Sequence, residues 1–181
     1  ADTDLPADLQ AELDALPDDV LRMERMAQLM AENPDDVRYV FHHANYAFDA
    51  EKLADAAAGY ERVIEMQPDL IDAHVNLGTV YDELDRLDDA LKAYRAAVEI
   101  DPTEDRVYCN MGVVYHKKRQ YAVAIEHFQK ALEVNPESQL AHYNMAILFT
   151  DTDIYREAIV EFQKAVDIDP NSDYGQRSAE N

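Results

Sequence analysis

Residues 71–104 read Ile71-Asp-Ala-His-Val-Asn-Leu-Gly-Thr-Val-Tyr81, then the polar stretch Asp-Glu-Leu-Asp-Arg, then Leu87-Asp-Asp-Ala-Leu-Lys-Ala-Tyr-Arg-Ala-Ala-Val-Glu-Ile100, and close on Asp-Pro-Thr-Glu104. Apolar residues recur at helical spacing on both sides of the polar stretch, which indicates two amphipathic helices. The proline that follows cannot continue a helix and disfavours the helical conformation of the residue before it. The stretch therefore predicts a helical hairpin with a defined end.

The same plan recurs along the chain with a 34-residue period. Proline stands at the same place in every period, at Pro34, Pro68, Pro102, Pro136 and Pro170. A fixed period of this length is typical of a stack of helical repeats. We predict four repeats over 37–70, 71–104, 105–138 and 139–172. Residues 1–36 are expected to form a degenerate N-terminal capping repeat, and 173–181 a polar C-terminal tail.

Small residues recur in pairs twelve positions apart, one in each helix of a hairpin. The pairs are Ala44 and Ala56, Gly78 and Ala90, Gly112 and Ala124, and Ala146 and Ala158. Small side chains at both positions let two helix backbones approach closely. Large rings lie around these positions, including Tyr81, Tyr94, Tyr115, Phe128, Phe149 and Phe162. We interpret this aromatic stripe as core and not as a cofactor site.

The two ends of the chain depart from the pattern. Pro6 to Leu16 and Pro17 to Glu32 are each expected to form a helix that begins at its proline. Their apolar faces should carry Leu9, Leu13, Leu16, Leu21, Met26, Leu29 and Met30. The residues after Asn171 are too short and polar to predict a final helix. We therefore expect either that the parent chain continues or that the apolar face of the last repeat is open to a partner.

These residues resemble the tetratricopeptide repeat, whose pattern is W-x2-L-G-x2-Y, A-x3-F and P. The tryptophan place holds Val40, His74, Tyr108 and His142, and the usual turn glycine is replaced by Glu51, Asp85, Arg119 and Asp153. The resemblance implies an all-α, right-handed solenoid of antiparallel helix pairs. The matching residues are Leu77-Gly78, Tyr81, Ala90, Tyr94, Ala97 and Pro102; Met111-Gly112, Tyr115, Ala124, Phe128, Ala131 and Pro136; and Met145-Ala146, Phe149, Ala158, Phe162, Ala165 and Pro170.

The resemblance also implies a concave groove lined by the first helix of each repeat, where a peptide segment of a partner binds. Asn76, Asn110 and Asn144 recur at the repeat spacing along this groove. An amide side chain donates and accepts hydrogen bonds, so the three could hold an extended peptide backbone, or they could support local structure. The expected groove residues are Arg38, Phe41, Asn45, Val75, Asn76, Arg106, Asn110, Val113, Lys117, Tyr143, Asn144 and Ile147, with Phe41, Val75, Val113, Tyr143 and Ile147 as apolar anchors.

Some relatives bind the C-terminal carboxylates of chaperones through Lys, Asn, Asn, Lys and Arg. Here Asn45 and Asn76 match and Arg106 preserves a charge. Phe41 and Asn110 replace two of the cations. The loss of two charges argues against that function.

Composition limits the classes of partner. The 181 residues include 38 acidic and 16 basic residues, which gives a formal net charge of -22. Because phosphate binding needs a basic surface, a nucleic acid or an anionic membrane is not expected as a partner. The acidic residues suit a solvated surface, or adaptation to high salt. The histidines lack metal-ligand spacing, Cys109 has no base beside it, and no phosphate-binding glycine loop occurs, so we expect no metal, cofactor or catalytic site.

We therefore expect a non-enzymatic adaptor that binds a protein or peptide. Two alternatives stay open: a scaffold that forms homo-oligomers through its C-terminal repeat, and the repeat domain of a larger enzyme or of a secretion or assembly factor. No run is apolar enough for membrane insertion. The expected compartment is the cytoplasm, or the periplasm if a signal peptide has been removed, since the chain begins at Ala1 without Met.

Overall fold

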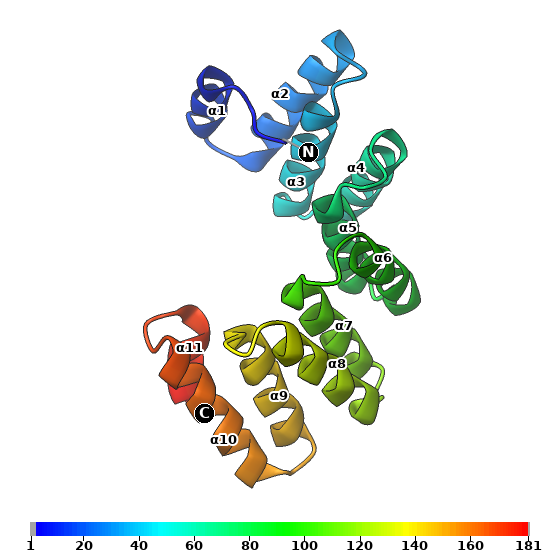
Figure 1. The fold of residues 1–181 in the computed structure, drawn as a ribbon. Coiled ribbons are helices and arrows are strands. Elements are labelled where there is room, and N and C mark those ends of the chain that lie inside the picture. The colour runs from blue at the N-terminus through cyan, green and yellow to red at the C-terminus, as the bar shows by residue number, and fades with distance from the viewer. Residues whose placement is uncertain (1–2, 181) are drawn as a thin grey trace. The chain divides into compact units, whose positions relative to one another are not determined.

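A computed structural model describes residues 3–180 and shows eleven helices and no strand in that range. The chain divides into two compact units, which we call unit 1 (through Ile100) and unit 2 (from Asp101), and each is described by itself. Unit 1 holds α1 (Ala7–Asp14), α2 (Asp19–Glu32), α3 (Val37–Asp49), α4 (Leu53–Met66), α5 (Ile71–Glu83) and α6 (Leu87–Ile100) (Figure 1). Unit 2 holds α7 (Asp105–Lys117), α8 (Tyr121–Val134), α9 (Gln139–Asp151), α10 (Tyr155–Ile168) and α11 (Asp173–Ala179).

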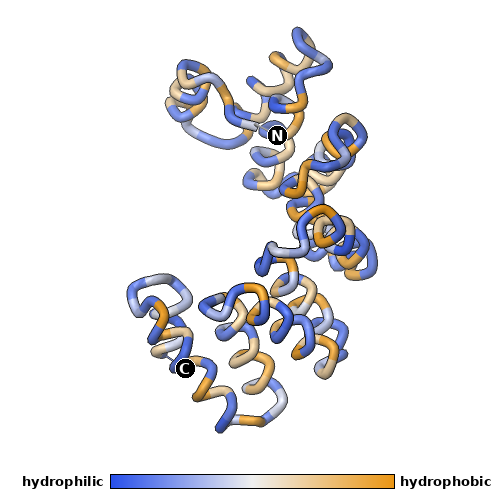
Figure 2. Tube along the Cα trace, in the orientation of Figure 1, coloured by the Kyte–Doolittle hydropathy of each residue, from blue (hydrophilic) through white to orange (hydrophobic). Residues whose placement is uncertain are grey.

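From α3 to α10 the helices form hairpins of one 13-residue and one 14-residue helix. The two helices of each hairpin pack against each other, and apolar and polar residues alternate around them (Figure 2). Predicted repeats 37–70 and 71–104 each hold one hairpin of unit 1, and 105–138 and 139–172 each hold one of unit 2. The all-α fold of antiparallel helix pairs is confirmed.

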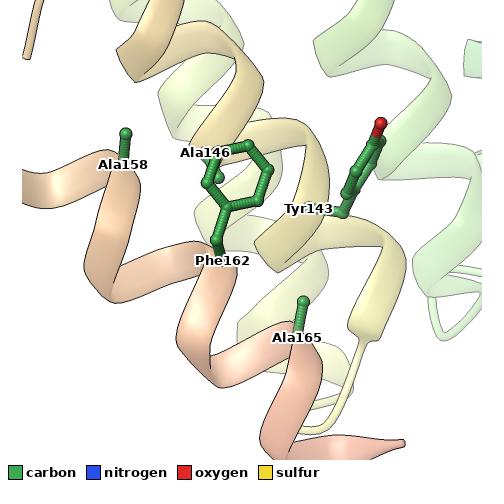
Figure 3. Close-up of a cluster of buried hydrophobic side chains, with 5 residues drawn as sticks. All are labelled: Tyr143, Ala146, Ala158, Phe162 and Ala165. Carbon is green, nitrogen blue, oxygen red and sulfur yellow. The ribbon is translucent and has the colours of Figure 1, made fainter. Parts of the chain in front are cut away.

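The small residues are buried between the two helices of a hairpin, and in the first full hairpin Ala44 lies against Gly59 of the second helix. Ala44, Ala56, Ala90, Ala124 and Ala146 are fully buried. A methyl group built on Gly112 would overlap the Phe128 ring, and one on Gly78 would overlap the Tyr94 ring. The rings therefore pack directly on the glycine backbone. In the last hairpin Phe162 faces Ala146 from the opposite helix (Figure 3).

The tryptophan place serves both the core and the loop before it. Val40, His74, Tyr108 and His142 are all buried. His74 Nε2 lies 2.8 Å from the carbonyl oxygen of Pro68, and the Tyr108 hydroxyl donates to that of Pro102 over 3.1 Å. His74 and Tyr108 thus hold the proline turn against the helix that follows it.

The N-terminal helices differ in detail from the sequence prediction. The first spans only Ala7–Asp14, and the second begins at Asp19 and not at Pro17. Asp18 sets that start, because its carboxylate accepts a hydrogen bond from Leu21 N over 2.9 Å and caps the helix. Leu9, Leu13, Met26 and Leu29 form a buried cluster against α3, as expected. Leu21, in contrast, is exposed.

The expectation that residues after Asn171 do not form a helix is wrong. Asp173–Ala179 form α11, which Ser172 caps by accepting a hydrogen bond from Gly175 N over 2.9 Å. α11 packs on α9 and α10. Gln139 fixes the junction, because its Nε2 donates to the carbonyl oxygens of Ala165 and Asp169 and its Oε1 accepts from Ser172. Local composition did not indicate this helix, since contacts with α9 and α10 stabilise it.

Candidate functional site

The predicted groove residues all lie on the first helices of the hairpins. In unit 1, α3 carries Arg38, Phe41 and Asn45, and α5 carries Val75 and Asn76. In unit 2, α7 carries Arg106, Asn110, Val113 and Lys117, and α9 carries Tyr143, Asn144 and Ile147. Each unit thus brings its own set of candidate residues onto two helices.

The candidate residues of unit 1 are joined by a polar network. The buried Tyr60 hydroxyl donates to Asn45 Oδ1 over 2.6 Å, and Asn76 Nδ2 donates to the same oxygen over 3.3 Å. Burial raises the pKa of Tyr60 well above its ordinary value, so this phenol stays neutral and donates. The acceptor oxygen of Asn45 is therefore already used within the fold.

One hairpin later, the Tyr94 hydroxyl lies 3.2 Å from Thr79 Oγ1, which also contacts the carbonyl oxygen of Val75 at 3.1 Å. Tyr60 and Tyr94 occupy the same place in successive repeats, and each pairs with a polar residue 15 positions earlier. Sequence reasoning missed this pairing, although the phenol and its polar partner are both visible at the repeat spacing.

The same two positions are apolar in unit 2. Phe128 and Val113 replace the first pair, and Phe162 and Ile147 the second. Ile147 packs against the cluster that contains Phe162. Where the ring lacks a hydroxyl, its partner lacks a polar group. The contact between the ring and its partner 15 positions earlier is therefore polar in both full hairpins of unit 1 and apolar in both hairpins of unit 2.

Three expected anchors are mostly covered by the protein itself. Phe41, Val75 and Tyr143 are each less than a tenth exposed. Phe41 meets Tyr60 edge to face at 6.0 Å, and Tyr143 meets Phe162 at the same distance. These three offer little surface to a ligand, and their role as anchors stays a prediction.

The helix that sequence reasoning missed covers part of α9. The Tyr174 ring lies 5.4 Å from that of Tyr143, and the Arg177 guanidinium lies over Tyr143 at 5.1 Å. α11 therefore adds Tyr174 and Arg177 to the neighbourhood of the predicted groove residues of unit 2.

Two amide side chains of unit 2 are available. Asn110 and Asn144 occupy the same repeat position on α7 and α9 and are half-buried, as are Val113 and Ile147. Among residues 3–180, no side-chain hydrogen bond joins either amide to another protein group. His116 Nε2 lies 3.1 Å from Asp151 Oδ2 and bridges the same two helices. Unit 2 thus presents unused amides beside apolar side chains.

The three cations among the predicted groove residues differ in how exposed they are. Arg38 donates to Asp36, the capping residue of α3, and this hydrogen bond lowers the pKa of Asp36. Arg106 is exposed and lies 3.7 Å from Glu104, and Lys117 is exposed at the end of α7. Arg106 and Lys117 are therefore more exposed than Arg38, which is half-buried.

Residues 3–180 contain no group of three or more His, Cys, Asp or Glu side chains placed to hold a metal ion. Cys109 is fully buried, and burial raises the pKa of its thiol to about 12. None of the helices there has the length and apolar character that crossing a membrane requires.

Comparison with protein families decides the classification. Models described as tetratricopeptide repeat match residues 41–105, 106–138 and 140–172. The chain belongs to the tetratricopeptide repeat family. The family consists of protein-interaction modules, and this is the class of function of the chain. A comparison with curated protein sequences found no match.

Solved tetratricopeptide repeat structures share the fold. TTC0263 from Thermus thermophilus is 20% identical with a TM-score of 0.77, covering 95% of this chain and 94% of its own. MamA from Desulfovibrio magneticus RS-1 is 19% identical with a TM-score of 0.74, covering 86% and 88%. YrrB, described as having an unusual peptide-binding site, is 18% identical with a TM-score of 0.68, covering 94% and 85%. At these identities the likeness concerns the fold.

Proposed function

We propose that this tetratricopeptide repeat protein is a non-enzymatic adaptor that binds an extended peptide segment of a partner protein along α7 and α9. The observation that carries the proposal is the pair of half-buried amides of Asn110 and Asn144, which the fold leaves unused. A peptide backbone offers both the donors and the acceptors that such amides need. The peptide-binding site named for YrrB supports the same class of ligand.

The surroundings favour a peptide with apolar and acidic side chains. Val113 and Ile147 offer half-buried apolar surface beside the amides. Arg106 and Lys117 are exposed on α7 and can meet a carboxylate. In unit 1, by contrast, Asn76 is already bonded to Asn45, so we assign that asparagine a structural role.

The test uses peptides selected on the full chain from a displayed random library and then synthesised. Calorimetry compares wild type with the double variant Asn110→Ala and Asn144→Ala. Each net hydrogen bond contributes about 0.5–1.5 kcal/mol, so affinity should fall about 5- to 150-fold. Helix content should not fall, because Ala is the better helix former.

Asn76→Ala is the matched control, since it removes the same side chain from the equivalent position of unit 1. It should leave peptide affinity unchanged. Equal affinity of wild type and the double variant, with the fold intact, would move the binding site away from α7 and α9.

A further inference from the structure

Residues of α9 and α10 enclose a small cavity, which we call the α9–α10 cavity. It has a volume of about 260 Å³ and is lined by Met145, Phe149, Arg156, Glu157, Val160 and Glu161. Pockets that bind cofactors or drug-sized molecules usually have volumes of about 300–1,000 Å³. The α9–α10 cavity is smaller, so it suits a single side chain of a partner.

The cavity opens at Val160, a position that is exposed in each hairpin from α3 to α10. Ala58, Lys92 and Glu126 occupy the same place in α4, α6 and α8, and all three are exposed although another hairpin follows each of them. The exposure of this position is therefore a property of the hairpin. Of the four residues only Val160 is branched and apolar, and it is 52% exposed.

The cavity is lined by an aromatic ring that lacks the cover found in other hairpins. Tyr81 and Tyr115 occupy the place of Phe149, and both are buried. The Arg86 guanidinium lies over the Tyr81 ring at 4.2 Å. The His127 ring stacks on Tyr115 with the ring centroids 5.0 Å apart. Phe149, in contrast, is only half-buried.

Two differences in sequence explain the uncovered ring. Ile154 stands five positions after it, in place of the arginine, and Glu161 stands twelve positions after it, in place of the histidine. The Glu161 carboxylate is hydrogen-bonded elsewhere, at 2.6 Å from His142 Nδ1 and 2.8 Å from Lys164 Nζ. A flat group can therefore lie on Phe149, as the histidine lies on the tyrosine in the preceding hairpin.

The charges that line the cavity indicate the polarity of that group. Arg156 and Glu157 are exposed, and within residues 3–180 neither takes part in a side-chain hydrogen bond or ion pair. A charged side chain would meet one like charge here. A neutral ring with an N–H or O–H group complements both, because an arginine can lie over the face of a ring and a carboxylate can accept a hydrogen bond from its edge.

We propose that the α9–α10 cavity binds a tryptophan or tyrosine side chain of a partner protein. The ring stacks on Phe149 beneath the Arg156 guanidinium and donates a hydrogen bond to Glu157. Tryptophan and tyrosine are among the side chains that most often dominate the affinity of a protein interface. Binding here does not require the amides of Asn110 and Asn144.

The probe is N-acetyl-tryptophanamide, a neutral tryptophan with both ends blocked. The chain contains no tryptophan, so the fluorescence of the probe can be followed by itself. The full chain is titrated into the probe at about 0.15 M salt, where the Debye length is about 8 Å. Binding should saturate with a dissociation constant of about 0.1–1 mM, as expected for a ligand of this size.

Val160→Lys tests the position of the site. The new lysine should pair with Glu157, as Lys92 pairs with Asp89 over 2.9 Å at the same places in α6, and so close the cavity. Ala122→Lys is the matched control, since it adds the same charge at an exposed position of α8. The control should bind the probe as wild type does, and Val160→Lys about tenfold or more weakly. Equal binding to the two variants would overturn the proposal.

Two measurements test the chemistry of the occupant. Arg156→Ala should weaken binding about 2- to 5-fold through loss of the contact between guanidinium and ring. N-acetyl-tyrosinamide should displace the probe, whereas N-acetyl-leucinamide should do so about tenfold or more weakly. Equal displacement by the two amides, or unchanged affinity of Arg156→Ala, would contradict the assignment of an aromatic side chain.

Further controls separate other sites and occupants. The double variant Asn110→Ala and Asn144→Ala should bind the probe as wild type does, and a loss there would place the probe on α7 and α9 instead. Sedimentation equilibrium of the free chain should show a monomer. A dimer that Val160→Lys abolishes would assign the cavity to a tyrosine of a second copy and overturn the proposal of a different partner.

Discussion

At the scale of single residues, the turns within the hairpins have a feature that the family pattern normally avoids. Glu51, Asp85, Arg119 and Asp153 have φ angles of 59°, 57°, 58° and 61°, in the left-handed region that favours glycine. The same backbone bonds recur at each turn: Arg119 N donates to His116 O over 2.8 Å, and Gln120 N to Tyr115 O over 2.9 Å. The hairpin geometry therefore imposes a conformation that costs a non-glycine residue about 1–2 kcal/mol.

Arg119→Gly should raise the free energy of unfolding by up to about 1 kcal/mol. Glycine removes the cost of the left-handed backbone conformation. It also makes the unfolded chain more flexible, which lowers the stability of the fold by about 0.5–1 kcal/mol. Urea unfolding followed by circular dichroism measures the change. Lys118→Gly is the control, because Lys118 has a φ of -74° and the change there should destabilise. Equal loss of stability in both variants would contradict this account.

At the scale of the helix pair, contact between glycine and an aromatic ring sets how closely α7 and α8 approach. Gly112→Leu should lower the free energy of unfolding by about 1–3 kcal/mol or more, because the added side chain meets the fully buried Phe128. Gly112→Ala should cost less, since Ala146 occupies the same position beside Phe162 (Figure 3). Thermal unfolding measures both. A midpoint unchanged by leucine would show that the helices do not cross at Gly112.

A buried hydrogen bond between His142 and Glu161 also joins α9 to α10. His142 Nδ1 lies 2.6 Å from Glu161 Oε2, and Lys164 Nζ lies 2.8 Å from Glu161 Oε1. Burial alone would raise the pKa of Glu161, but the hydrogen bonds and charges of His142 and Lys164 together hold it below its ordinary value. A carboxyl whose pKa is lowered on folding stabilises the protein above its unfolded pKa and loses that effect as the pH falls through its folded pKa.

Glu161→Gln should therefore destabilise unit 2 at pH 7, by about 1.5–3 kcal/mol for hydrogen bonds to a charged group. The difference from wild type should shrink as the pH falls below the unfolded pKa of about 4.3. Urea titrations at a series of pH values give this difference. Glu157→Gln, at an exposed acid of the same helix, is the control and should show little effect. A difference that does not vary with pH would rule out the ionic contribution.

At the scale of the whole molecule, the net charge of -22 sets the response to salt. Repulsion between like charges opposes the folded state, and salt screens it. The melting temperature should rise with NaCl, most steeply below about 0.3 M and less up to about 1 M, where the Debye length is about 3 Å. A melting temperature that rises linearly over the whole range of NaCl concentration would indicate an effect of salt on the solvent and not the screening of charges. A flat or falling melting temperature would contradict the charge argument.

The sequence by itself determined the helix pairs and their core. The 34-residue period, the prolines and the small residues at Gly78 and Gly112 were enough to predict them. In a stack of repeats each repeat contacts only its neighbours, so the residues that form its core are close together in sequence. The apolar cluster at the N-terminus also followed from helical spacing, apart from Leu21, whose exposure depends on where the Asp18 cap starts α2.

Only the tertiary structure decided which candidate residues are covered and which are already hydrogen-bonded within the fold. Tyr143 is covered by Tyr174 and Arg177 of a helix that local composition did not indicate, and Asn76 is bonded to Asn45 of another repeat. Exposure and hydrogen bonding depend on neighbours that are distant in sequence, whereas helix formation depends on periodicity within a few turns.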